Sequence, residues 1–220
     1  MPLSPEAFVA ELAAENEAAL ARIVQKGTAG EPGPEVTIPK LLTLALKNEI
    51  EATECAAAWL STTPEVRVKL ALARQAGDEA KHYRLIERRL AELGVDTRGH
   101  DPFAAGRSPL LGWLLGLEGT AARVAAGQFT REGLALVRNE AFIAFCRHQE
   151  DHATAMLYAE IIQPDERRHH ELGREILLEL ATTDDAQRAA REASRKVLAM
   201  AEELQEIARL KAGISRAPGC

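Results

Sequence analysis

The chain contains few aromatic residues and no stretch that marks a strand. Phenylalanine, tryptophan and tyrosine together make up 4% of its 220 residues. Nowhere do apolar and polar residues alternate as they do in a half-buried strand. Alanine, leucine, glutamate and arginine are abundant instead, and these residues favour helices over sheets. The sequence therefore predicts an all-α protein.

Cysteine is also scarce. The chain has three, Cys55, Cys146 and Cys220, which are widely spaced and odd in number. They form neither a zinc-binding pattern nor a disulfide framework. This usage is typical of a protein in a reducing compartment, so we expect a cytoplasmic location.

Positive charge and long hydrophobic runs are lacking as well. The formal net charge is −6, which argues against nucleic-acid binding. The most apolar stretch, residues 110–117, is too short to cross a bilayer and is followed by Glu118. The first six residues show no signal-peptide pattern. We therefore expect no membrane association.

Helical periodicity accounts for most of the chain. Turn-forming residues separate predicted helices at about 4–27, 39–60, 64–93, 109–147, 152–180 and 184–212. Five glycines weaken the fourth of these and leave open whether it is broken. We predict a single domain over residues 1–220. Its core, at about 39–180, is a four-helix bundle of two hairpins joined by the long connection 94–108, with an extra helix at each end.

Two motifs of the same form lie inside these helices. Residues 78–82 read Asp-Glu-Ala-Lys-His, and residues 165–169 read Asp-Glu-Arg-Arg-His. A glutamate and a histidine three residues apart project from one face of a helix. The motif alone is weak evidence, because a glutamate-rich sequence produces it by chance. Here, however, both copies fall on the apolar stripe of their helix, which predicts that they are buried.

Two further glutamates lie on apolar stripes at the matching depth. Antiparallel helices bring together residues that are equally far from the connecting turn. With turns near residues 62 and 149, Glu49 lies within one turn of the level of Glu79, and Glu132 lies level with Glu166. The other glutamates of these helices lie off the stripe or about 12 Å further along the axis. Three of them stay open as alternatives if the register differs: Glu51, Glu54 and Glu140.

Six side chains thus form a candidate metal site: Glu49, Glu79, His82, Glu132, Glu166 and His169. Burying four carboxylates and two imidazoles is costly unless cations compensate them. Two divalent ions would do so, with carboxylates bridging the pair, and this donor set suits iron or manganese. We predict two iron ions, with manganese or a mixed pair left open. Asp78 and Asp165 are predicted to accept a hydrogen bond from a histidine N–H, with plain surface charge as the alternative.

Other residues near the motifs have two readings each. Tyr83 follows His82, and Tyr158 precedes Glu166 by two turns, so either tyrosine is a candidate for redox activity or simply packs in the core. Pro164 removes a helical hydrogen bond and bends the chain. Beside Glu166 this bend either widens the helix and opens a face of the metal site, or is a kink without a function. Three small residues on the ligand face leave room for a substrate or allow close helix packing: Ala155, Ala159 and Gly173.

The order Glu, Glu-x-x-His, Glu, Glu-x-x-His resembles that of the ferritin-like superfamily of di-iron carboxylate proteins. The separations here are 49 to 79 and 132 to 166, and the resemblance covers about residues 39–180. It implies a metal-bound helical bundle that reacts with dioxygen or peroxide.

From this resemblance we expect an oxidoreductase, either an oxidase or an oxygenase, that uses dioxygen on a small organic substrate with an electron donor still to be identified. The alternative is an iron-oxidising or peroxide-removing protein of the ferritin or rubrerythrin type. Storage ferritins usually lack the second Glu-x-x-His, and rubrerythrins often carry a Cys-rich iron domain that is missing here. A purely structural helical module would require the metal site to be absent. We expect a small oligomer such as a homodimer.

Overall fold

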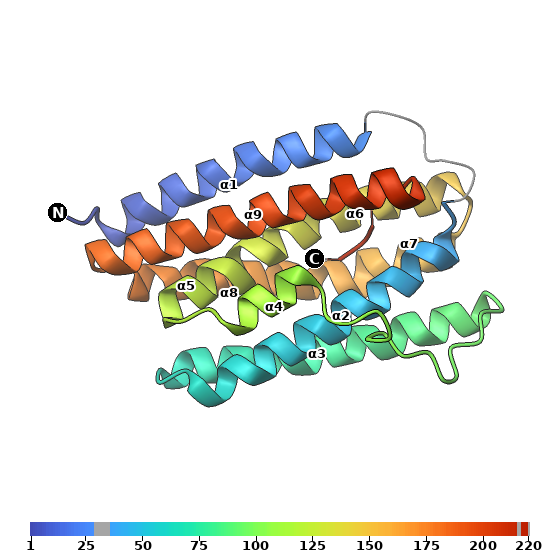
Figure 1. Cartoon of the computed structure of the whole chain (residues 1–220), viewed down its shortest axis with the longest axis horizontal. Coiled ribbons are helices and arrows are strands. Elements are labelled where there is room, and N and C mark those ends of the chain that lie inside the picture. The colour runs from blue at the N-terminus through green and yellow to red at the C-terminus, as the bar shows by residue number, and fades with distance from the viewer. Residues whose placement is uncertain (29–35, 215–216, 220) are drawn as a thin grey trace.

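The computed structural model describes residues 1–28, 36–214 and 217–219, and the described residues form helices and connections without any strand (Figure 1). The all-α prediction is therefore confirmed. The long helices are α1 (Pro5–Thr28), α2 (Ile38–Thr62), α3 (Val66–Glu92), α6 (Glu132–His148), α8 (Gln163–Leu180) and α9 (Asp184–Ala212). The shorter segments are α4 (Pro109–Leu115), α5 (Thr120–Val124), α7 (His152–Leu157) and the π-helical segments η1 (Ala125–Arg131) and η2 (Tyr158–Ile162).

Hydroxyl side chains begin several of these helices where the sequence predicts them. Thr37, Ser108 and Thr183 each accept a hydrogen bond from the backbone N–H three residues on. Such caps satisfy N–H groups that have no partner inside the helix. The third helix differs from expectation, because it begins at Val66 and not at Pro64.

The helices pair as two hairpins and a terminal pair. Helix α2 packs along α3, and the run from α5 through η1 to α6 packs against α8. Figure 1 shows α1 and α9 along one side, α2 and α3 along the other, and α6 and α8 between them. Contacts between α3 and α8 join the two hairpins. The four helices that carry the predicted ligands thus share one core, and the terminal helices cover it.

The glycine-rich stretch 109–147 is interrupted at one place. Helix α4 stops at Gly116, and Gly119, with φ of 81°, precedes α5. From Thr120 to His148 the chain continues helically through η1. Gly127 lies where a β-carbon would come within 2.8 Å of the Trp59 ring, so this glycine allows a close approach of the helices without breaking one.

Both π-helical segments lie next to predicted ligands. Segment η1 ends directly before Glu132, and η2 ends four residues before Glu166. Pro164 explains the second of these: it has no N–H to offer the carbonyl four residues earlier, and its ring would clash with that carbonyl. A π turn at this point widens the helix, as it often does beside functional sites.

Residues 217–219, near the end of the chain, return to the core. The side-chain amide of Asn48 donates to the carbonyl of Pro218 at 3.0 Å, and the N–H of Gly219 donates to Asn139 Oδ1 at 2.8 Å. Pro218, Gly219 and Asn139 are all buried. This C-terminal tail therefore joins α2 to α6.

Two apolar clusters lie on either side of the predicted ligands. One includes Trp59, Leu72 and Ile176, and the other includes Leu46, Ile86 and Phe142. The predicted ligands thus sit between two apolar parts of the core.

Among the described residues, no helix combines the length and the apolar character needed to cross a membrane.

Candidate metal centre

Six buried side chains from four helical segments converge between the two apolar clusters. Their atoms form two groups of possible metal ligands, each with all its donor atoms within 4.8 Å of one another. The first group is Glu49, Glu79, His82 and Glu166, and the second is Glu79, Glu132, Glu166 and His169. Glu79 and Glu166 belong to both. The structure therefore brings together all six residues that the sequence singles out, and it makes two of the carboxylates common to both groups.

Each histidine turns its Nδ1 atom toward the carboxylates. His82 Nδ1 lies 3.3 Å from Glu79, 3.4 Å from Glu49 and 3.6 Å from Glu166. His169 Nδ1 lies 3.5 Å from Glu79 and 3.4 Å from Glu166. Nδ1 is thus the nitrogen that each ring offers to the centre.

The opposite nitrogen of each ring meets an aspartate of the other motif. His82 Nε2 lies 3.2 Å from Asp165, and His169 Nε2 lies 3.2 Å from Asp78. An aspartate in this place keeps the proton on Nε2 and leaves the Nδ1 lone pair directed inward. The two motifs are therefore interlocked, because each one holds the histidine of the other in its orientation.

Lys81 lies between the two aspartates. Its ammonium group pairs with Asp165 and lies 3.6 Å from Asp78, while Arg168 contacts Asp165 at 2.7 Å. Burial would raise the pKa of Asp165, but hydrogen bonds from Lys81, His82 and Arg168 hold that pKa well below its ordinary value. Asp165 is therefore ionised and able to accept the histidine N–H. The sequence prediction did not include Lys81.

A chain of amides reaches Glu132 from the other direction. Gln128 donates to Gln75 at 3.0 Å, and Gln75 donates to Glu132 at 2.6 Å and to Glu79 at 3.4 Å. Both glutamines are buried. They fix the orientation of two carboxylates. The sequence prediction included neither glutamine, although Gln75 lies on the apolar stripe of its helix and Gln128 is a polar residue inside an apolar run.

The alternative glutamates lie outside the cluster. Glu51 is buried, but its two oxygens accept from the N–H of Ser108 at 2.7 Å and from its hydroxyl at 2.5 Å, at the start of α4. Glu54 pairs with Arg107 at 3.1 Å, and Glu140 is exposed. The hairpin register is therefore the one that places Glu49 and Glu132 at the centre.

The two tyrosines differ in their surroundings. Tyr83 is partly exposed. Tyr158 is fully buried, stacks edge-on against Phe142, and its hydroxyl has no hydrogen-bond partner in the part of the chain that the structure describes. Burial raises the pKa of Tyr158 well above its ordinary value, and the charges of Glu49 and Glu166 add to the shift. Of the two tyrosines, Tyr158 is therefore the one that interacts electrostatically with carboxylates of the centre.

Three buried ligand atoms of the cluster have no hydrogen-bond partner among the described residues: Glu132 Oε2, Glu166 Oε2 and His169 Nδ1. Buried polar atoms are rarely left without a partner. Their residues, Glu132, Glu166 and His169, all belong to the second group of donors, where a cation would bind them together. The residues present therefore fit a metal site with oxygen and nitrogen donors.

No family model, curated protein or solved structure matches this chain. The geometry of the cluster therefore carries the functional argument.

The pKa shifts within the cluster show that burying it without cations is costly. Burial raises the pKa of Glu49 to about 7 and holds the pKa values of Glu132 and Glu166 well above the ordinary range. Burial acts against the charge of His82 too, but Glu49 and Glu79 outweigh it and raise the histidine pKa to about 12. Burial also opposes ionisation of Glu79, yet His82 and His169 lower its pKa to about 2. Near neutral pH, the metal-free centre thus holds protons in place of cations.

We expect metal binding to release these protons. Donor groups must lose their protons to bind a cation, so filling the centre near neutral pH should release protons into the buffer. Apparent affinity should therefore rise as the pH rises through the pKa of Glu49. Calorimetric titration with ferrous or manganous ion in two buffers of different ionisation enthalpy measures the number released. Equal binding enthalpies in the two buffers would contradict the expectation.

Proposed function

We propose that the protein is a dinuclear metal oxidoreductase of the ferritin-like kind, which binds two iron ions and uses dioxygen to oxidise a small organic substrate. The observation that carries the proposal is the pair of overlapping donor groups with Glu79 and Glu166 in common. Carboxylates that belong to both groups are placed to bridge two cations, as in di-iron bundles.

The charges of the cluster match two divalent ions. Four ionised carboxylates and two neutral imidazoles carry a charge of −4, which two divalent ions balance. Glu49 and His82 would complete the binding of one ion, and Glu132 and His169 that of the other. The oxygen and imidazole donors favour iron or manganese over thiolate-seeking metals. Cys55 and Cys146 are buried and belong to neither group.

The protein itself supplies orientation and exclusion of water. When bound, the metal pair supplies the redox chemistry toward dioxygen. Asp78 and Asp165 hold the two rings, Gln75 holds two carboxylates, and the apolar clusters on both sides keep bulk water away from the centre. Exclusion of water strengthens the electrostatic interactions inside such a site and protects reactive species from side reactions.

Ferrous loading in the absence of oxygen tests this function. After exposure to air, the loaded protein should consume dioxygen and still hold about two iron ions per chain, because the donor set has no place for more. An oxygen electrode, elemental analysis and size-exclusion chromatography measure these quantities, and we expect a small oligomer such as a dimer. A Glu166→Ala variant serves as the control and should consume no dioxygen above the buffer rate.

The iron-storage or peroxide-removing alternative predicts different results. A large hollow assembly that keeps many iron atoms per chain after titration with excess ferrous ion would replace the proposed function with storage. Rapid loss of peroxide without dioxygen consumption would replace it with a protective role.

A further inference from the structure

Three buried polar side chains outside the metal centre form a closed ring of hydrogen bonds. Asn16 of α1 donates from Nδ2 to Thr130 Oγ1 of η1 at 2.9 Å, and Ser194 of α9 donates to Asn16 Oδ1 at 2.6 Å. Because Ser194 uses its one hydroxyl hydrogen in this bond, the Thr130 hydroxyl donates to Ser194 Oγ at 2.7 Å. None of the three residues is more than 5% exposed. This polar triangle therefore joins both terminal helices to η1.

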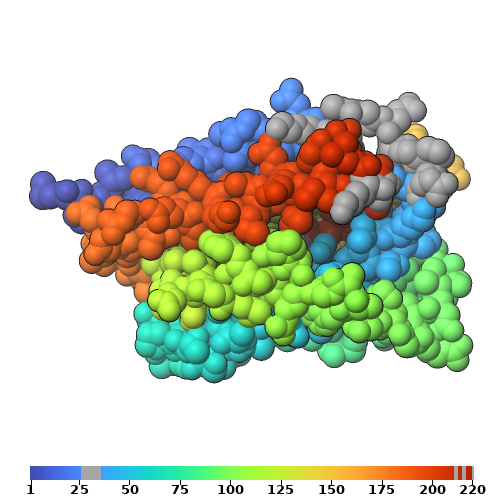
Figure 2. Space-filling view, in the orientation of Figure 1, coloured from blue at the N-terminus to red at the C-terminus, as the bar shows by residue number. Residues whose placement is uncertain are grey.

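The surroundings of the polar triangle are apolar. One turn before Asn16, Leu12 belongs to an apolar cluster with Ala193, and one turn after it, Leu20 belongs to a smaller cluster with Leu198. Figure 2 shows α1 and α9 packed side by side along the surface. A polar group buried among such residues lowers stability unless it is hydrogen-bonded. Each member depends on the other two, so the triangle fixes α1, η1 and α9 in one relative position.

Thr130 and Glu132 lie on different sides of the same helical run. Residues two apart in a helix do not face each other. Thr130 meets α1 and α9, whereas Glu132 points into the donor cluster. The groups of a functional site must be held within ~0.5 Å of their working positions. The contact of Thr130 thus fixes, from outside, the backbone that carries Glu132.

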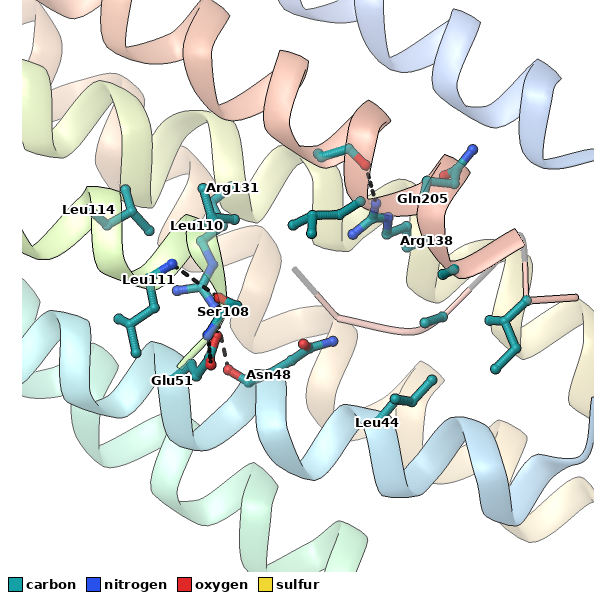
Figure 3. A pocket seen from close by; sticks show the side chains of 15 residues that line it. Leu44, Asn48, Glu51, Ser108, Leu110, Leu111, Leu114, Arg131, Arg138 and Gln205 are labelled. Atoms are coloured by element: carbon teal, nitrogen blue, oxygen red, sulfur yellow. Dashed lines mark hydrogen bonds between the residues drawn. The ribbon is translucent and has the colours of Figure 1, made fainter. Parts of the chain in front are cut away.

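The residue between these two is anchored to α2. Figure 3 shows Arg131 beside Ser108, and its guanidinium group donates to the carbonyl of Asn48 at 3.4 Å. Helices α8 and α9 pack directly on η1. The turn before Glu132 is therefore held by α2 through Arg131 and by the terminal helices through Thr130.

We propose that Thr130 is a positioning residue for Glu132 and that Asn16 and Ser194 hold Thr130 in place. The terminal helices then belong to the metal centre and do more than cover it. Metal binding at Glu132 rests on the proposed function, whereas the order that the triangle gives to η1 does not. Because Glu132 belongs to the second donor group alone, the triangle should act on one of the two ions.

Manganous ion is the probe for this proposal, and single-ion variants separate the two donor groups in calorimetric titrations. His82→Ala keeps the group that contains Glu132, and His169→Ala keeps the group that contains Glu49. Thr130→Val replaces the hydroxyl with a methyl group. Added to His82→Ala, it should raise the Kd roughly 10-fold, at the low end of the range for outer contacts of metal ligands. Added to His169→Ala, it should leave the Kd unchanged.

Three further variants serve as controls. Thr130→Ser keeps the hydroxyl and should restore the lower Kd, and Ser194→Ala breaks the triangle from α9 and should act like Thr130→Val. Gln187→Met is the matched control, because Gln187 is also buried and lies two turns before Ser194 on α9, but it bonds to the backbone of Leu3 and Ala181. This variant should lower Tm and leave the Kd unchanged.

Amide hydrogen exchange of the metal-free protein tests the same contact without a cation. Exchange in residues 125–134 should be faster in Thr130→Val than in the wild type or Gln187→Met, because local opening of this segment costs less free energy.

The proposal would be overturned by an unchanged Kd in folded Thr130→Val and Ser194→Ala variants, by an equal rise in both single-ion backgrounds, or by exchange no faster than in Gln187→Met. A wild type that binds no manganous ion would reject the proposed function, and hydrogen exchange would then decide the positioning of this turn by itself.

Discussion

Replacing Glu79 or Glu166 with alanine should remove both metal ions, whereas replacing His82 or His169 should remove about one of the two that a di-iron bundle holds. The two glutamates belong to both donor groups, and each histidine belongs to one. Removing a shared carboxylate also removes a negative charge that would compensate both cations. Elemental analysis after ferrous reconstitution without oxygen measures the metal content.

The sequence supplies matched controls for this experiment. Glu54 and Glu140 lie on the same helices as Glu49 and Glu132 but outside the cluster. Glu54→Gln and Glu140→Gln should keep the wild-type metal content. Full metal content in a folded Glu79→Ala or Glu166→Ala variant would contradict the assignment of shared ligands.

Gly173→Ala should destabilise the protein by about 1–3 kcal/mol, which in a chain of this size lowers Tm by roughly 2–12 °C. An added β-carbon would lie 2.7 Å from Gln128 Cβ and 2.8 Å from backbone atoms of Gln128 and Phe129. The backbone of η1 cannot move aside as the end of a flexible side chain can. Because Gln128 supports Gln75 and thereby Glu132, the metal affinity should fall as well. Thermal melting followed by circular dichroism measures the first effect, and metal titration measures the second.

Gly77→Ala is the matched comparison. Gly77 lies inside α3, next to Asp78, and a β-carbon there would meet no atom within 4 Å. Alanine in a helix interior is more favourable than glycine by about 0.5–1 kcal/mol, so this variant should be slightly more stable than the wild type. Similar melting temperatures for the two variants would show that the contact at Gly173 does not limit the packing of α8 on η1.

The helical fold and the six clustered residues could be predicted because charged residues at core positions are a strong signal. Glu79, His82, Glu166 and His169 interrupt apolar stripes at helical spacing. Antiparallel pairing then selects Glu49 and Glu132 by their depth and by their place on the apolar stripes. The spacing of residues on one face of a helix and their distance from the hairpin turn are both set by the backbone. The sequence pattern reports both.

The contacts around the cluster depend on side-chain reach between helices, which the sequence pattern does not report. The pattern predicted that Asp78 and Asp165 would each accept from a histidine, but it did not show that each aspartate serves the histidine of the other motif. The same holds for Lys81, which spans from α3 to Asp165 on α8. Gly173 was open between a substrate cavity and close packing, and the backbone of η1 fills the space.

The buried tail has a practical consequence for the design of expression vectors. Pro218 and Gly219 are held by Asn48, the residue before Glu49, and by Asn139, two turns after Glu132 on α6. An affinity tag attached behind this tail would pull on both anchors and so loosen two of the carboxylates that the cations need. Met1, in contrast, is fully exposed. Metal affinities should therefore be measured on protein purified through an amino-terminal tag.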